Sequence, residues 1–174
     1  MKKVKSIVLD LVQKKVLAKA SLFAIFLVLA TFAPLLKQQL ITGSIVNALL
    51  FLSTIYLGIT AGLLISFLPS IFSIFTGLLP IPLIPMIPFI IISNMILVLS
   101  FNFLRKRNLE FSIILASLIK FVFLFATSSF IINFFIKGSL PKKIVIMMAW
   151  PQLITALLGG LVVFIILKAR TKNE

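Results

Sequence analysis

The sequence predicts an all-α integral membrane protein, a bundle of six transmembrane helices with an amphipathic helix before the first span. Two observations predict this fold class. Of the 174 residues, 61% are hydrophobic, and no Asp, Glu, Lys or Arg occurs from Gln38 to Leu104. A water-soluble fold could not solvate so long an apolar stretch, whereas a bilayer accommodates one helical span in about 20 apolar residues.

Residues 1–15 combine apolar and basic side chains. Val4, Ile7, Val8 and Leu11 recur at helical spacing among lysines. Such a segment is typical of an amphipathic helix on the anionic inner surface of a membrane. A secretory signal peptide is the alternative interpretation, with residues 21–33 as its apolar core, but the charged segment before that core is long.

Charges and helix breakers divide the rest of the chain into apolar runs. Gly58 and Gly62 separate the second run from the third, and prolines from Pro80 to Pro88 separate the third from the fourth. The run RKRNLE, which begins at Arg105, separates the fourth from the fifth. We therefore predict a single membrane domain over 1–174, with a tail at 168–174 and spans at 16–36, 44–61, 63–79, 89–104, 111–136 and 144–167.

The basic residues predict the orientation. Six spans put both termini on one side, and cytoplasmic loops carry an excess of Lys and Arg. With cytoplasmic termini, the basic residues inside are Lys2, Lys3, Lys5, Lys14, Lys15, Lys19, Arg105, Lys106, Arg107, Lys168, Arg170 and Lys172. Those outside are only Lys37, Lys137, Lys142 and Lys143. We therefore expect a multi-pass protein with both termini in the cytoplasm, although the loop at 137–143 is basic on the outer side.

The composition excludes several function classes. The formal charge of +14 comes from basic residues in short clusters beside the apolar runs. This is the distribution expected for the loops of a membrane protein, so nucleic acid is not an expected partner. The absence of Cys and His excludes thiol chemistry and His-ligated metals. The acidic residues Asp10, Glu110 and Glu174 lie at or beyond the ends of apolar segments, which leaves no carboxylate pair for catalysis in the membrane. No GxxxxGKS or GxxxxGKT loop occurs, and we expect no enzyme, no cofactor and no metal site.

Polar side chains recur at one depth, in the outer half of the predicted membrane. An amide that faces lipid would be costly, so these side chains should face the interior of the bundle. They could hold helices together, or they could line a shared pocket. The residues come from four spans and are Asn47, Asn94, Asn133, Trp150 and Gln152.

Two positions in the last two spans leave alternatives open. Pro151 is expected to kink the sixth span and to free a carbonyl beside Trp150 and Gln152, although Trp150 could instead belong to an interfacial aromatic belt. Lys120 is the only charge well inside an apolar run. It could be the counter-ion of a ligand, or its ammonium could reach the cytoplasmic surface along the helix.

Small residues mark two expected packing seams. Ala20 and Ala24 form a small-xxx-small pair on the first span. Gly159 and Gly160 leave the sixth span without side chains at two adjacent positions. Both allow close approach of another helix. The alanine seam could pack within the chain or dock another membrane subunit.

Together these features resemble the substrate-binding S component of an energy-coupling-factor (ECF) transporter. The resemblance rests on six short spans, cytoplasmic termini, the Ala20-x-x-x-Ala24 motif and polar residues at the outer ends of the later spans. Three segments are similar to S-component-like proteins of unassigned ligand from anaerobic bacteria, namely TGSIVNALL (42–50), LLPIPLIPMIPFIIISN (78–94) and AWPQLITALLGG (149–160).

The resemblance implies a subunit of a bacterial importer that captures a vitamin or another micronutrient from outside the cell membrane. It also implies a membrane coupling subunit docked on the face of Ala20 and Ala24, and two cytoplasmic ATPase subunits that supply energy. The outer amides, Trp150 and Lys120 would then contact the substrate. The alternative class is a small structural or assembly membrane protein without a ligand.

Overall fold

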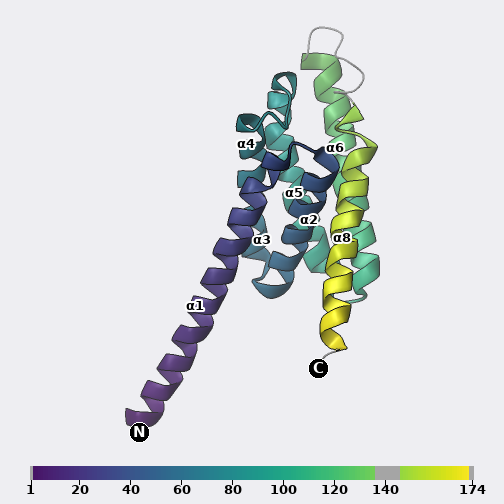
Figure 1. Cartoon of the computed structure of the whole chain (residues 1–174). Helices are drawn as coiled ribbons and strands as arrows, with labels where there is room; N and C mark the ends of the chain where they lie inside the picture. Colours follow the sequence, from purple (N-terminus) through teal and green to yellow (C-terminus); the bar gives the residue numbers. More distant parts are fainter. Residues whose placement is uncertain (1, 136–145, 173–174) are drawn as a thin grey trace.

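The computed structural model is helical over the residues that it describes. It describes residues 2–135 and 146–172, with side chains over 10–131 and 146–172, and it contains no strand there. The predicted all-α class is confirmed (Figure 1). The elements are α1 (Lys2–Phe32), the 3-10 helix η1 (Ala33–Leu36), α2 (Gln39–Tyr56), α3 (Ile59–Ile65), α4 (Leu68–Phe75), the 3-10 helix η2 (Ile81–Met86), α5 (Ile87–Leu104), α6 (Leu109–Phe135) and α8 (Trp150–Thr171).

Within the described ranges, five helical segments are long and apolar enough to cross a membrane. They are Asp10–Leu36, Gln39–Tyr56, Ile81–Leu104, Leu109–Ile131 and Trp150–Thr171. The apolar segment Ile59–Phe75 is shorter. The start of α1 and the end of α8 lie at the same end of the molecule (Figure 1). The chain is therefore a multi-pass membrane protein.

The third predicted span is divided into two short helices. Gly58 adopts a φ of 97°, which only glycine reaches without strain, and this turn separates α2 from α3. Helix α3 then ends at Ile65, because Pro69 has no N–H to donate to the carbonyl of Ile65. The prediction of one continuous span over 63–79 is wrong in this respect.

The fourth and fifth predicted spans agree with α5 and α6 to within two residues. The proline cluster forms η2 and ends with Pro88 in the first turn of α5, where a missing N–H costs no helical hydrogen bond. Asn108 precedes α6, and its Oδ1 accepts a hydrogen bond from the backbone N–H of Phe111 at 3.1 Å. This bond satisfies one of the unpaired donors at the start of the helix.

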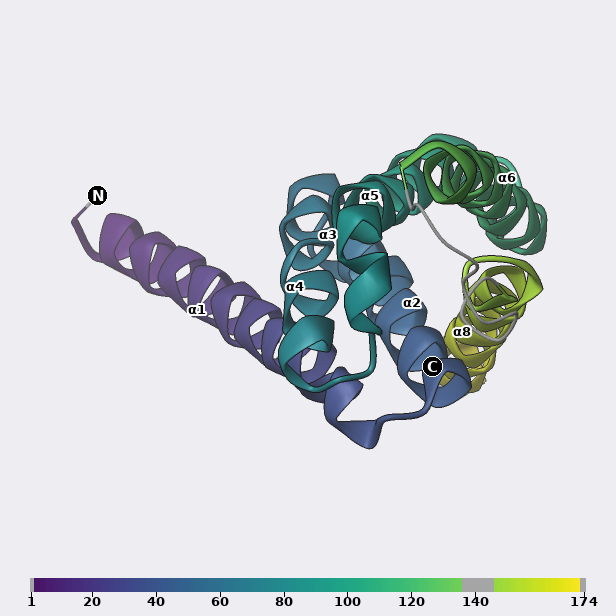
Figure 2. The same cartoon turned by 90° about the horizontal axis from the view of Figure 1, so that it is seen from above.

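Helix α1 is continuous through the boundary that the sequence analysis places after residue 15. The amphipathic segment is helical, but the structure does not separate it from the first span. The helix leaves the bundle toward its N-terminus (Figures 1 and 2). The side chains from Asp10 to Ser21 are exposed, and Ala20 and Ala24 are exposed with them. Within the part of the chain that the structure describes, the alanine pair is not an internal packing seam.

Helix α8 begins at Trp150, so the structure corrects the predicted kink at Pro151. The proline lies in the first turn of α8 rather than two turns inside a span, and there it interrupts no helix. The predicted beginning of the sixth span at residue 144 and the basic loop at 137–143 lie outside the described residues.

Four helices form the centre of the bundle. Helix α2 packs along α8 and against α5, and α6 packs against both α5 and α8. Helices α3 and α4 lie between α1 and α5 (Figure 2). The upper part of α1 packs on α4.

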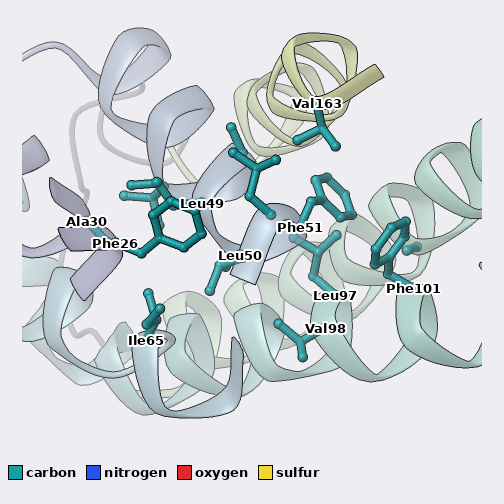
Figure 3. Close-up of a cluster of buried hydrophobic side chains, with 14 of the residues drawn as sticks. Phe26, Ala30, Leu49, Leu50, Phe51, Ile65, Leu97, Val98, Phe101 and Val163 are labelled. Carbon is teal, nitrogen blue, oxygen red and sulfur yellow. The ribbon is translucent and has the colours of Figure 1, made fainter. Parts of the chain in front are cut away.

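An apolar core joins α1, α2, α3, α5, α6 and α8. Leu50 and Phe51 of α2 are fully buried at its centre, and the ring of Phe51 meets that of Phe101 edge to face at 4.8 Å (Figure 3). Such an aromatic pair stabilises the fold by about 1 kcal/mol beyond its burial. The core thus fixes α2 against α5 below the polar residues described next.

The glycine seam on α8 permits the closest helix contact. A methyl group on Gly159 would lie 2.7 Å from the backbone nitrogen of Ala48 and 2.7 Å from the carbonyl oxygen of Ser44. Both atoms belong to the backbone of α2 and cannot move aside. The prediction that Gly159 and Gly160 form a packing seam is therefore confirmed.

We expect Gly159→Ala to lower stability by about 1–3 kcal/mol, because the added methyl group forces α8 away from α2. Thermal unfolding of the purified protein in detergent measures the effect. Val162→Leu also adds one carbon to α8, but at an exposed position, and should leave the unfolding temperature unchanged. Equal stability of the two variants would show that α2 and α8 are not in backbone contact.

Candidate functional site

A buried lysine lies at the centre of the polar residues. The Lys120 ammonium on α6 donates hydrogen bonds to Asn47 Oδ1 at 2.6 Å and to Asn94 Oδ1 at 2.7 Å. Lys120 is 3% exposed, Asn94 4% and Asn47 1%. Three residues from three helices therefore meet at one point inside the bundle.

A fourth helix joins this cluster through Thr155 of α8. Asn47 Nδ2 donates to Thr155 Oγ1 at 3.3 Å, and the Thr155 hydroxyl donates to the carbonyl of Gln152 at 3.1 Å. The amide of Asn47 thus accepts from α6 and donates to α8. Such a connected network fixes the orientation of each polar group, since every hydrogen bond restricts the rotation of the side chains that form it.

The environment of Lys120 excludes one of the two alternatives for its side chain. Its ammonium bonds to amides inside the bundle and does not extend along α6 to the end of the helix. An ionisable group held inside a membrane protein usually faces other helices or a polar cavity. Lys120 has such a position.

A cavity of about 100 Å³ adjoins the cluster. This volume holds several water molecules or a small organic ligand. Polar and apolar side chains line it together, namely Pro34, Gln39, Thr42, Gly43, Val46, Asn47, Pro69, Ser70, Ser73, Leu78, Leu79, Ile90, Asn94, Lys120, Met147, Met148 and Gln152. Five of these residues, Pro34, Leu78, Leu79, Met147 and Met148, belong to the segments between α-helices at the end of the bundle away from the termini (Figure 1).

Two glutamines lie beside the carbonyl of Met147 at this end. Gln39 Nε2 donates to the Met147 oxygen at 2.6 Å, and Gln152 Nε2 donates to it at 3.1 Å. Met147 lies four residues before Pro151, which has no N–H to donate to it. The Met147 carbonyl therefore lacks a helical donor, and the two glutamine side chains supply donors in its place, so the prediction of a free carbonyl is wrong.

The structure brings together most of the predicted site residues. Asn47, Asn94, Lys120 and Gln152 all line the cavity. Trp150 is not brought to it, because its side chain is 54% exposed on the first turn of α8. Asn133 belongs to α6, but its side chain lies outside the described residues.

Sequence reasoning predicted Asn47 of α2 but missed the other residues of this helix that line the cavity. Gln39, Thr42, Gly43, Val46 and Asn47 all line the cavity, and their spacing places them on one helical face. Thr42 and Gln39 were visible as polar residues one turn apart before Asn47, so this spacing could have identified them. The serines of α4, in contrast, gave no signal, since their placement depends on the break before Leu68.

Nothing in the described residues offers a metal site, because no three His, Cys, Asp or Glu side chains gather there. Comparisons with protein-family models, with curated proteins and with solved structures find no match to this chain. The candidate site is thus defined by its own geometry, a lysine and several amides beside a small cavity.

Removal of one amide acceptor should destabilise the protein. Asn94→Leu keeps the number of side-chain heavy atoms but leaves the buried ammonium with a single acceptor, which should cost about 1–3 kcal/mol. Asn102→Leu is the matched control, since Asn102 is on the same helix, half-buried and outside the cluster. Thermal unfolding in detergent should separate the two variants. Similar losses in both would mean that the Lys120 contact contributes little.

Proposed function

We propose that the chain is the substrate-binding membrane subunit of an ECF-type importer, and that it captures a small molecule. The observation that carries the proposal is the cavity beside Lys120. Polar groups from α2, α5, α6 and α8 converge there inside an otherwise apolar bundle. Ligand sites of this kind combine apolar walls with a few well-placed polar groups.

The proposed orientation places the cavity mouth outside a bacterial cell membrane and both termini in the cytoplasm. The excess of basic residues at the end of the termini supports this orientation. The cavity-lining connections lie at the opposite end. A substrate would then enter from outside and rest about halfway along α6, beside Lys120. The ligand class expected from the resemblance is a vitamin or another micronutrient.

Energy for uptake would come from other subunits. The chain contains no phosphate-binding glycine loop. The proposed partners are a membrane coupling subunit and two cytoplasmic ATPase subunits, as in the family that the sequence resembles. Ala20 and Ala24 are exposed on a helix that leaves the bundle, which suits close approach by a partner helix.

A structural or assembly protein without a ligand is the second candidate. One observation favours it, because Lys120, Asn47 and Thr155 already bond to one another. Residues that satisfy one another can hold helices together without any ligand. The two candidates differ in whether the cavity is occupied during purification from cells.

Small molecules retained by the purified protein test the proposal. Mass spectrometry of an extract should find a molecule that remains with the wild type and with Asn102→Ala. Gln152→Ala should retain about tenfold less of it, because the cavity loses a polar contact, while Met147 keeps its bond from Gln39. A folded wild type from which no molecule is recovered would favour the structural protein.

Docking should depend on the exposed face of α1. Ala24→Leu should prevent close approach of a partner helix and abolish co-purification of the coupling and ATPase subunits, while the unfolding temperature stays unchanged. Val28→Leu is the control, since Val28 is exposed on the same helix and already large. Assembly that is normal in both variants would exclude this docking face.

A further inference from the structure

The charge of Lys120 has no counter-ion among the described residues. Asp10 pairs with Lys14 at 3.0 Å on the exposed part of α1. Glu110 is exposed and lies ten residues before Lys120, about 15 Å along α6. The cavity lining contains no carboxylate. Neutral amide oxygens are therefore the only acceptors that the described residues provide to this ammonium.

The groups of the cluster that lack a hydrogen-bond partner are donors. An ammonium has three N–H groups, and Lys120 uses two of them. Because both asparagine oxygens face Lys120, the amide nitrogens point elsewhere. Asn47 Nδ2 donates to Thr155, whereas Asn94 Nδ2 has no hydrogen-bond partner in the described part of the chain. The site therefore lacks an acceptor group and one negative charge.

We propose that the ligand is a small monocarboxylate, with its carboxylate oxygens on Lys120 Nζ and Asn94 Nδ2. This inference rests on the proposed function, since it names the class of molecule that the cavity would hold. A carboxylate supplies two acceptor oxygens and one negative charge, which matches the unused donors and the single ammonium.

The rest of the cavity suits the remainder of such a molecule. Val46, Leu79, Ile90 and Met148 supply apolar walls, and Gln39 and Gln152 lie beside Met147, another lining residue. A ligand with one carboxylate and a short, mainly apolar body matches these apolar walls and the few polar groups. A phosphate dianion does not, because the lining carries only one positive charge.

The test uses matched probes of similar size and shape, in which an amide replaces the carboxylate and so removes the charge and one acceptor oxygen. Benzoate and benzamide, nicotinate and nicotinamide, and hexanoate and hexanamide are compared at millimolar concentrations by the unfolding temperature of the full chain in detergent. At least one carboxylate should stabilise the wild type and bind about tenfold more tightly than its amide, which corresponds to about 1.4 kcal/mol.

Two aspartate variants test the position of the charge. Asn94→Asp places a carboxylate in contact with Lys120, where it supplies the missing counter-ion, and carboxylate probes should bind about tenfold more weakly. The new ion pair keeps the cluster bonded, so the variant should fold. Asn102→Asp adds the same charge to α5 outside the cluster and should leave the affinity unchanged.

Three outcomes would overturn the inference. They are equal stabilisation by amides and carboxylates, no stabilisation by any carboxylate, and an unchanged carboxylate affinity in Asn94→Asp. Failure of the proposed function has a different signature. A neutral molecule retained by the purified protein would exclude the carboxylate but leave the capture function intact, whereas no retained molecule and no response to any probe would exclude both.

Discussion

The interaction of Lys120 with two asparagine oxygens constrains the whole bundle. A lysine inside a membrane-spanning helix is tolerated only where its ammonium finds acceptors, because lipid offers none. Asn47 and Asn94 supply these acceptors from α2 and α5 at 2.6 and 2.7 Å. The three helices must therefore keep their relative depth to within a fraction of a helical turn. Any vertical shift of α6 would leave a charge and two amides unbonded.

Helix packing makes this polar arrangement possible. Helix α8 approaches α2 until Gly159 meets the backbone of Ala48, and this approach brings Thr155 within 3.3 Å of Asn47 Nδ2. The apolar core around Phe51 holds α2 against α5 from below. The cavity adjoins the cluster on the side away from this core, where the connecting segments and the short helix α4 contribute lining residues.

The helices could be predicted from the sequence where local chemistry determines their ends. The site could be predicted only in part. The ends of α5 and α6 were predicted to within two residues from charges and prolines beside apolar runs. Such residues affect only the helical turn in which they lie. The break before α4 has a local cause in Pro69, which the prediction of one span over 63–79 did not use, whereas the position of Pro151 in the first turn of α8 depends on how neighbouring segments pack. The common depth of Asn47, Asn94 and Gln152 followed from helical rise alone. The position of Lys120 did not, since lipid headgroups or amides 73 and 26 residues away could each have satisfied its ammonium.

The order of Asn47, Asn94 and Lys120 along the chain has a consequence for biosynthesis. Many hydroxyls of the helices synthesised before α6, such as those of Ser53, Thr54 and Ser93, bond to carbonyls of their own helix. A helix of that kind can enter the bilayer from the translocon without help. The segment that carries Lys120 is different, because a lysine at the centre of a span raises the cost of insertion by about 3 kcal/mol. Both asparagines lie in α2 and α5, which are synthesised before α6. When α6 leaves the ribosome, its two acceptors are already in the membrane.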